Sequence, residues 1–341
     1  MLNSTFILQC AGRLALIGTL IAALTAAAAA DNAVPAKQLF GAASLPASLP
    51  AQPYGFYTKG CLAGGVALPT DGPTWQAMRL SRNRRWGHPD MIALVERLSR
   101  EAAAEDGWPG LLVGDIAQPR GGPMTSGHAS HQLGLDADIW LNPMPAQRYT
   151  KERRESVSAV SMLKEGTLHV DPEKWTTAHA RLLLRAASYP QVQRIFVHPG
   201  IKKKLCDTWE GDRTNLGKLR PYWGHHYHFH IRMRCPDDAV NCRPQAGIGN
   251  GDGCGKSLAW WFGDEPWKPA EPPKKGQKPK PKPEIRLADL PGACARVIDA
   301  GAPPSAAAAT YGIGYANPPE LREQSGAAPV DIPVPTPRPK P

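Results

Sequence analysis

The chain has 341 residues, of which 36 are proline and 33 are glycine, so much of it cannot form regular helix or sheet. One core of about 200 residues with irregular flanks is therefore expected. The net charge of +10 does not indicate a nucleic-acid partner, because much of the excess lies in the proline-lysine tracts 274–283 and 338–341. Such tracts stay extended and solvated instead of forming a basic face.

The first 30 residues predict a secretory signal peptide. Their only charge is Arg13, an apolar run from Leu14 to Ala30 follows, and charge returns at Asp31. The alternative is an uncleaved membrane anchor, because this run approaches the lower limit of roughly 17 residues for a membrane span. Its many small residues favour the signal peptide. We expect cleavage near Ala30, export to the periplasm, and no stable membrane insertion afterwards.

Regular elements are predicted in chain order from local patterns. Residues 31–54 carry too many prolines for a helix or a central strand and are expected to form an irregular lead-in. The spacing of apolar residues over 89–107 predicts an amphipathic helix. A second helix is predicted over 171–190, with Asp171 as its cap. The β-prone run 194–197 predicts a buried strand.

The C-terminal part divides by composition. Residues 266–285 are expected to be a Pro/Lys-rich linker, and residues 301–341 a disordered tail rich in proline and alanine. Between them, 286–300 contains a cysteine and is expected to return to the main domain as a disulfide-pinned strap. The main domain is placed at 55–265.

Cysteine usage predicts disulfides. Seven cysteines are present, and removal of the leader takes Cys10 away. The remaining six form an even set, which in an oxidising compartment indicates three disulfides, although their spacing does not select one pairing. They lack the CxxC spacing of zinc knuckles and redox pairs, so structural disulfides are expected.

The segment SGHASHQLGLDADIW (126–140) carries the first histidine group. From residue 133 on, apolar residues alternate with Gly134, Asp136, Asp138 and Trp140, which predicts a half-buried strand with both carboxylates on one face. Asp138 on this strand and His131 at its entrance can converge on one point.

The segment GHHYHFHIRMRC (224–235) carries the second group and also alternates as a strand with one polar face. His228 and His230 point the same way, about 7 Å apart by the rise per residue. One of them can join His131 and Asp138 on a metal ion, and the other is left beside it. Two histidines and one aspartate with an open fourth position is the composition of a catalytic zinc site, whereas a structural site would be closed by four ligands.

Beside such a site, a neighbouring histidine can take a proton from water and deliver it to the leaving amine. Packing several imidazoles together without a metal or a proton-transfer role would bury poorly paired polar groups. His88, His179 and His198 are interpreted as structural residues, and His226 is placed on the opposite strand face from the site.

Together, GDIAQPRGGPMTSGHASHQLGLDADIW and GHHYHFHIRMRCP resemble the penicillin-insensitive murein endopeptidases, a branch of the metallopeptidase superfamily that includes lysostaphin and D-Ala-D-Ala dipeptidases. The superfamily pattern, SHxxGxxxD plus HxH, occurs at 130–138 and 228–230. The resemblance covers roughly residues 55–295. It implies zinc ligands His131, Asp138 and His230, an acid/base and transition-state-stabilising pair His225 and His228, and His128 at the edge of the site as a further ligand candidate.

The resemblance also implies the disulfides Cys61–Cys294, Cys206–Cys254 and Cys235–Cys242. Some members of the family hold a further metal ion through a DxxH-like element, and in this chain His169 stands at the histidine position of that element. There, Gly166 stands where a carboxylate is expected and Glu165 is one residue off, so we expect one catalytic zinc ion.

Arg120 is a candidate cation for the substrate carboxylate or the developing oxyanion, with a surface salt bridge as the alternative.

The expected fold is α+β, with a small central antiparallel sheet that carries the metal site, flanked by helices and long loops and stapled by disulfides. The residues indicate metal-assisted amide hydrolysis. The resemblance adds the substrate, which is the D-alanyl-meso-diaminopimelyl cross-link of peptidoglycan, and a D,D-endopeptidase activity. The alternatives are a D,D-carboxypeptidase or dipeptidase acting on uncrosslinked stem peptides, and a non-catalytic member that binds the cell wall.

Overall fold

The computed structural model describes residues 34–269 and 283–315. The predicted signal peptide, most of the predicted linker and the end of the predicted tail lie outside the described residues. Within 34–269 and 283–315, none of the helices combines the length and the apolar character needed to cross a bilayer.

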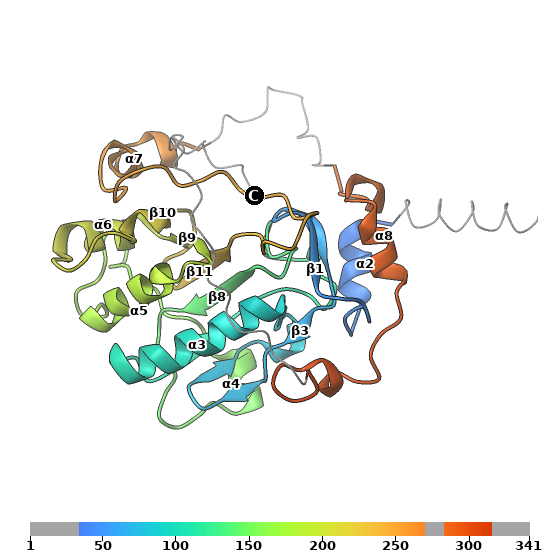
Figure 1. The fold of residues 1–341 in the computed structure, drawn as a ribbon. Coiled ribbons are helices and arrows are strands. Elements are labelled where there is room, and N and C mark those ends of the chain that lie inside the picture. Colours follow the sequence, from blue (N-terminus) through green and yellow to red (C-terminus); the bar gives the residue numbers. More distant parts are fainter. Residues whose placement is uncertain (1–33, 270–282, 316–341) are drawn as a thin grey trace, which may run out of the picture.

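A seven-stranded mixed sheet forms the centre of the described structure, in the order β10-β9-β11-β8-β7-β5-β4 (Figure 1). Its strands are β4 (Asp71–Gly72), β5 (Trp75–Ala77), β7 (Leu111–Val113), β8 (Asp136–Trp140), β9 (Val192–Val197), β10 (Leu219–Pro221) and β11 (His228–Met233). The predicted α+β class is confirmed. The neighbours β9, β11, β8 and β7 pair antiparallel, as predicted, whereas the pairs β10–β9 and β5–β7 are parallel.

Two short hairpin-like pairs and a set of helices surround this sheet. β1 (Gln52–Phe56) pairs with β2 (Lys59–Ala63), and β3 (Val66–Ala67) pairs with β6 (Trp86–Gly87). The α-helices are α2 (Ala36–Ala42), α3 (Pro89–Glu105), α4 (Lys151–Ser156), α5 (Thr177–Ser188), α6 (Pro199–Thr208), α7 (Lys256–Ala259) and α8 (Ala293–Asp299). Short 3₁₀ turns are η1 (Leu80–Arg82), η2 (Leu216–Lys218), η3 (Trp260–Phe262), η4 (Glu265–Trp267), η5 (Leu287–Asp289) and η6 (Ala307–Ala309).

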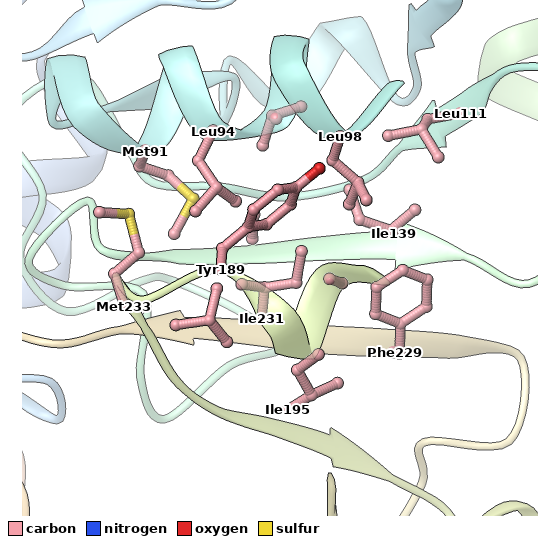
Figure 2. Packing of buried hydrophobic residues seen from close by; sticks show 14 of the residues in the cluster. Met91, Leu94, Leu98, Leu111, Ile139, Tyr189, Ile195, Phe229, Ile231 and Met233 are labelled. Atoms are coloured by element: carbon pink, nitrogen blue, oxygen red, sulfur yellow. The ribbon is translucent and has the colours of Figure 1, made fainter. Parts of the chain in front are cut away.

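One face of the sheet is covered by α3 and α5 and forms the main core. Leu94 and Leu98 of α3 point toward Ile139 of β8 and toward Phe229 and Ile231 of β11 (Figure 2). All five side chains are fully buried. Each such side chain contributes roughly 1.5–3 kcal/mol through its burial. Because side chains alternate along a strand, the polar residues of β8 and β11 are directed to the other face.

The second predicted helix begins later than expected. Helix α5 starts at Thr177, and its cap is Thr176, which forms a capping box with His179. Residues 171–176 form turns instead, in which Asp171 accepts the backbone N–H of Glu173. The capping prediction for Asp171 is wrong, because a local side-chain turn imitates the start of a helix.

The lead-in and part of the tail are more regular than predicted. Helix α2 follows directly after Pro35, a position where the missing proline N–H costs nothing, and Phe40 fixes it in a small apolar cluster with α8. In Figure 1, α2 and α8 lie beside each other next to β1. After α8, residues 301–315 return to the core, where the Tyr311 N–H donates to the Ala67 carbonyl at 2.9 Å.

Three disulfides fasten the outer segments. They join Cys61 to Cys294, Cys206 to Cys254 and Cys235 to Cys242, the same pairs that the resemblance implies. The first links β2 to α8 and so holds the strap against the domain. The third closes a short loop just after β11.

Candidate metal centre

Strands β8 and β11 bring the predicted polar residues together. In their antiparallel register, His230 lies opposite Asp138 and Arg232 lies opposite Asp136. Directly opposed residues on one face are close enough for their side chains to interact. The two strands therefore place both carboxylates, one imidazole and one guanidinium in one buried patch.

His131 stands just before β8 in a left-handed backbone conformation, with φ of 67°. Its backbone N–H donates to Asp136 Oδ2 at 3.0 Å, and its ring Nδ1 is 2.6 Å from the Ile116 carbonyl oxygen. Because a carbonyl oxygen only accepts hydrogen bonds, Nδ1 carries a proton, and Nε2 has a lone pair for a metal only when the ring is neutral. This tautomer can bind a metal through Nε2.

Asp138 lies between two further potential ligands, His131 and His230. Its Oδ1 lies 3.4 Å from His131 Nε2 and 3.4 Å from His230 Nδ1. Both His131 Nε2 and Asp138 Oδ1 are buried and make no hydrogen bond within the described residues. Buried polar atoms without partners are rare in native proteins and indicate a missing ligand or ion. Two imidazole nitrogens and one carboxylate oxygen suit zinc, so the residues present fit this metal.

The electrostatics keep this carboxylate ionised. Burial would raise the pKa of Asp138, but His131, His228 and His128 together hold it well below its usual value. Burial opposes protonation of His131, yet the Asp138 charge outweighs this and raises the pKa of His131 to about 9. A metal ion that binds Nε2 would therefore displace a proton from it. The strong attraction between these groups shows that the site is built around opposite charges at short distance.

Asp136, which was not predicted as a site residue, orients the two histidine ligands by hydrogen bonds on the side away from Asp138. Its Oδ1 accepts hydrogen bonds from His230 Nε2 at 2.8 Å and from Arg232 Nε at 2.7 Å. This leaves His230 Nδ1 free to face Asp138. Carboxylates that hold metal-binding histidines in this way fix the ring and raise its basicity. The strand alternation did place Asp136 beside Asp138, but it could not show which carboxylate faces the metal.

His128 lies at the rim of the site, between two carboxylates. Its Nε2 is 3.1 Å from Asp115 Oδ2 and 3.4 Å from Asp138 Oδ2. The potential ligand atoms of His128, His131 and Asp138 all lie within 4.8 Å of one another, and this is the metal-ligand group found in the described residues. The sequence did not predict Asp115 at the site. Its Oδ2 also pairs with Arg84 Nη1 at 2.9 Å. Burial opposes its ionisation, but His128 and Arg84 lower the pKa of Asp115 to about 2.

His225 and His228 form the predicted pair beside the ligands. Their ring centroids are 4.8 Å apart, and His228 Nε2 lies 3.7 Å from Asp138 Oδ1. The proton on His225 Nδ1 is donated to the Trp223 carbonyl, which leaves Nε2 as the basic atom. Burial lowers the pKa of both imidazoles, so both are neutral near pH 7.

His128 lines three cavities, two of which also contain other residues of the centre. The first, of about 300 Å³, also contains Asp138 and His228. The second, of about 380 Å³, contains His225 and His230. The third, of about 290 Å³, contains His128 alone among the site residues. A substrate that occupies the first two cavities passes directly over the potential metal ligands.

Two predicted site residues lie elsewhere. Arg120 lines none of the three cavities around His128. Its guanidinium donates to the carbonyl oxygens of Val297 and Ile298, both at 2.6 Å, and so anchors α8. His169 is exposed and stacks on Phe262, outside the metal-ligand group of the described residues.

The histidines interpreted as structural have structural contacts. The side chains of His88 and His198 accept the first backbone N–H groups of α3 and α6. His179 belongs to the capping box of α5, and its Nε2 lies 3.0 Å from the Leu141 carbonyl oxygen. His226 contacts the Ser161 hydroxyl at 2.8 Å.

Comparison with known proteins gives consistent matches. A family model described as penicillin-insensitive murein endopeptidase matches residues 53–299. A penicillin-insensitive murein endopeptidase of Haemophilus influenzae is 47% identical over 236 residues, which covers 68% of this chain and 79% of the relative. Relatives of the same name from Klebsiella pneumoniae and Pectobacterium atrosepticum are 39% and 37% identical, and the matches cover 73% and 83% of this chain and 86% and 96% of those proteins.

Proposed function

Because the chain belongs to the penicillin-insensitive murein endopeptidase family, we propose that it is a zinc-dependent D,D-endopeptidase that hydrolyses the D-alanyl-meso-diaminopimelyl cross-link of peptidoglycan in the periplasm. The observation that supports the zinc dependence is that the buried atoms His131 Nε2 and Asp138 Oδ1 make no hydrogen bond within the described residues, although they lie 3.4 Å apart with His230 Nδ1 beside them. Peptidoglycan as the substrate is taken from the relatives' names.

His131, Asp138 and His230 would hold the zinc ion, and His128 lies near enough to contribute at the rim. When bound, zinc supplies Lewis-acid polarisation of the scissile carbonyl and makes water acidic enough to react near neutral pH. The chain's own contribution is to fix the donor atoms. Hydrogen bonds to Asp136 and to the Ile116 carbonyl orient the rings of His230 and His131 and occupy the nitrogens that face away from Asp138.

The neutral pair His225 and His228 supplies proton transfer. His225 Nε2 has a free lone pair because its Nδ1 proton is held by the Trp223 carbonyl, so this atom accepts the proton of the attacking water. The Nε2 of His228 lies 3.7 Å from Asp138 Oδ1. Once His228 is protonated, it stabilises the negative charge that develops on the carbonyl oxygen of the substrate. No serine or cysteine nucleophile is required, so β-lactams, which acylate serine, have no target here.

Digestion of purified cross-linked muropeptide dimers tests this function. The zinc-loaded protein should convert dimers to monomers, chelation should stop the reaction, and zinc should restore it. Release of D-alanine from uncrosslinked pentapeptides without dimer cleavage would instead support the carboxypeptidase alternative. Binding of the polymer without any hydrolysis would support a non-catalytic member.

A variant pair tests the metal assignment. His230→Ala should lose both bound zinc and dimer cleavage, because the substitution removes one of the three proposed ligands and its hydrogen bond to Asp136. His169→Ala is the matched control, since this exposed histidine stacks on Phe262 away from the ligand group, and it should keep both. Full zinc content and activity in His230→Ala would show that the metal lies elsewhere.

A further inference from the structure

The two cavities at the metal centre differ in their charged residues. The smaller one, here named the arginine cavity, is lined by Arg79, Arg82, Asp115 and Asp138 among its charged groups. The larger one, here named the aromatic cavity, is lined by three aromatic side chains, and its only cation is Arg232. The aromatic side chains are Phe56, Phe196 and Tyr222.

Arg79 and Arg232 each already donate three hydrogen bonds within the described residues, and the Arg232 side chain is only 5% exposed. Arg79 donates to the backbone carbonyl groups of Arg154, Glu155 and Val157, so it forms part of the cavity wall. Arg232 makes two hydrogen bonds to Asp136 and one to Gln245 at 2.9 Å, and its guanidinium lies 4.2 Å from the ring centroid of Tyr57. The aromatic cavity therefore offers a bound anion no available guanidinium.

Arg82 differs from both. Its side chain is 48% exposed, and within the described residues its guanidinium makes one hydrogen bond, to Asp115 Oδ2 at 3.2 Å. Asp115 is already paired with the buried Arg84 at 2.9 Å and contacts His128 at 3.1 Å. Since an arginine has five N–H donors, most of those on Arg82 remain for a ligand in the arginine cavity.

The turn that carries Arg82 is braced on both sides. Arg79 and Asn83 flank η1 with φ values of 54° and 51°, a conformation that costs energy for residues other than glycine. Hydrogen bonds hold this turn: Ser81 donates twice to the Glu155 carboxylate, at 2.9 and 2.7 Å, and the Asn83 amide donates to the Ser44 carbonyl at 3.0 Å. The Arg82 backbone is thus fixed before substrate arrives.

The substrate of the proposed function carries a matching anion. In meso-diaminopimelic acid, the amino group that forms the cross-link sits on a carbon that also bears a carboxylate. This negative charge lies on the leaving-group side, next to the scissile nitrogen. A guanidinium is the side chain best suited to a carboxylate, because it can donate two parallel hydrogen bonds.

We propose that Arg82 binds this carboxylate and so sets the direction of the substrate. The diaminopimelyl leaving group then occupies the arginine cavity, and the D-alanyl side occupies the aromatic cavity, which has no free cation. This inference rests on the proposed endopeptidase function, and it makes Arg82 a specificity-determining residue for a carboxylate next to the scissile amide.

Two synthetic substrates test the inference with the zinc-loaded protein. One is an N-acyl-D-alanyl amide of meso-diaminopimelic acid, and the other has the adjacent carboxyl group converted to a carboxamide. The wild-type protein should prefer the acid by about 10- to 100-fold in kcat/KM, the range expected for losing a hydrogen bond to a charged group. In Arg82→Gln, kcat/KM for the acid should fall by the same factor of about 10- to 100-fold, while kcat/KM for the carboxamide stays unchanged. The two substrates should then be hydrolysed with equal kcat/KM.

Arg100→Gln is the matched control, because Arg100 is 58% exposed on α3 with a single ion pair at 3.8 Å to Glu96 and does not line the cavity. It should keep the wild-type preference. Arg82→Lys should keep part of it, because the charge remains but the paired donors are lost. Unchanged zinc content and melting temperature establish that the variants are folded.

Three results separate the possible failures. Equal hydrolysis of acid and amide by the wild-type protein overturns the role of Arg82, whatever the variants do. A full preference retained by folded Arg82→Gln also overturns it. If the zinc-loaded wild-type protein cleaves neither compound nor cross-linked dimers, the endopeptidase function itself is wrong.

Discussion

Replacing Asp136 with asparagine tests whether one buried carboxylate organises the metal centre. Asp136 is fully buried and accepts hydrogen bonds from His230, from Arg232 and from the backbone N–H of His131. Asparagine has nearly the same shape, but it carries no charge and presents an NH₂ group where one carboxylate oxygen accepted a hydrogen bond. At least one of these donors would then face another donor.

The expected effect has two components. Arg232 is 4% exposed, so without its counter-charge it becomes a buried unpaired cation, and the loss should be about 3–5 kcal/mol of unfolding free energy. His230 loses the charged partner of its Nε2–H, and zinc affinity should fall about 10- to 100-fold. Both losses come from one substitution at a residue that does not touch the metal.

Urea unfolding of the apoprotein measures the first component, and competition with a fluorescent zinc chelator measures the second. Asp207→Asn is the matched control, because Asp207 is 51% exposed and pairs with Lys203 at 2.7 Å on the surface of α6. It should change stability by no more than about 0.5 kcal/mol. Wild-type stability and zinc affinity in Asp136→Asn would refute the organising role of Asp136.

Three further predictions concern the scaffold. Burial lowers the pKa of His198 from 6.5 to about 4, so the unfolded chain takes up a proton first as the pH falls. The free energy of unfolding is therefore unaffected by this group above pH 6.5. It falls by at most about 3 kcal/mol as the pH decreases from 6.5 to 4. His198→Asn keeps an acceptor for the Gly200 N–H and should flatten the acid loss in urea unfolding at pH 7 and pH 4; an unchanged acid loss would contradict this. Replacing Cys61 and Cys294 by serine opens a link between residues 233 positions apart and should cost up to about 5 kcal/mol in calorimetry, whereas a cost below 1 kcal/mol would speak against the link as a restraint on unfolding. Arg120→Gln should lower stability by about 1.5–3 kcal/mol with kcat/KM unchanged, and a selective loss of kcat/KM would return Arg120 to the active site.

Local periodicity was sufficient to predict the strands that carry the site. The alternation over 133–140 and 227–234 depends only on side-chain direction along one strand, so it predicted which residues share a face with Asp138 and His230. The half-buried character predicted for these strands is wrong, because every residue of β8 and β11 is buried. The period over 89–107 likewise predicted α3. The roles of individual histidines came from the resemblance, because the strand pattern does not distinguish a ligand from its neighbour.

Partners that are distant in sequence could not be predicted in this way. Asp115 contacts His128 directly and is paired with Arg84, a cation from another segment, and Arg120 binds carbonyl groups 177 and 178 positions away. Nothing near Arg120 in the sequence reveals these acceptors. The helix α2 was missed for a related reason, since a helix of 7 residues is unstable alone and exists here because Phe40 packs against α8.

The left-handed conformation of His131 depends on the buried hydrogen-bond network around Asp136. A φ of 67° is unfavourable for a residue with a side chain, so the surroundings must hold it. Asp136 Oδ2 accepts the His131 N–H at 3.0 Å, while its Oδ1 holds His230 at 2.8 Å. One carboxylate thus fixes the backbone of one ligand and the ring of another, and its charge is balanced by Arg232 rather than by a metal. Hydrogen bonds from the chain itself therefore position both histidines of the proposed zinc site.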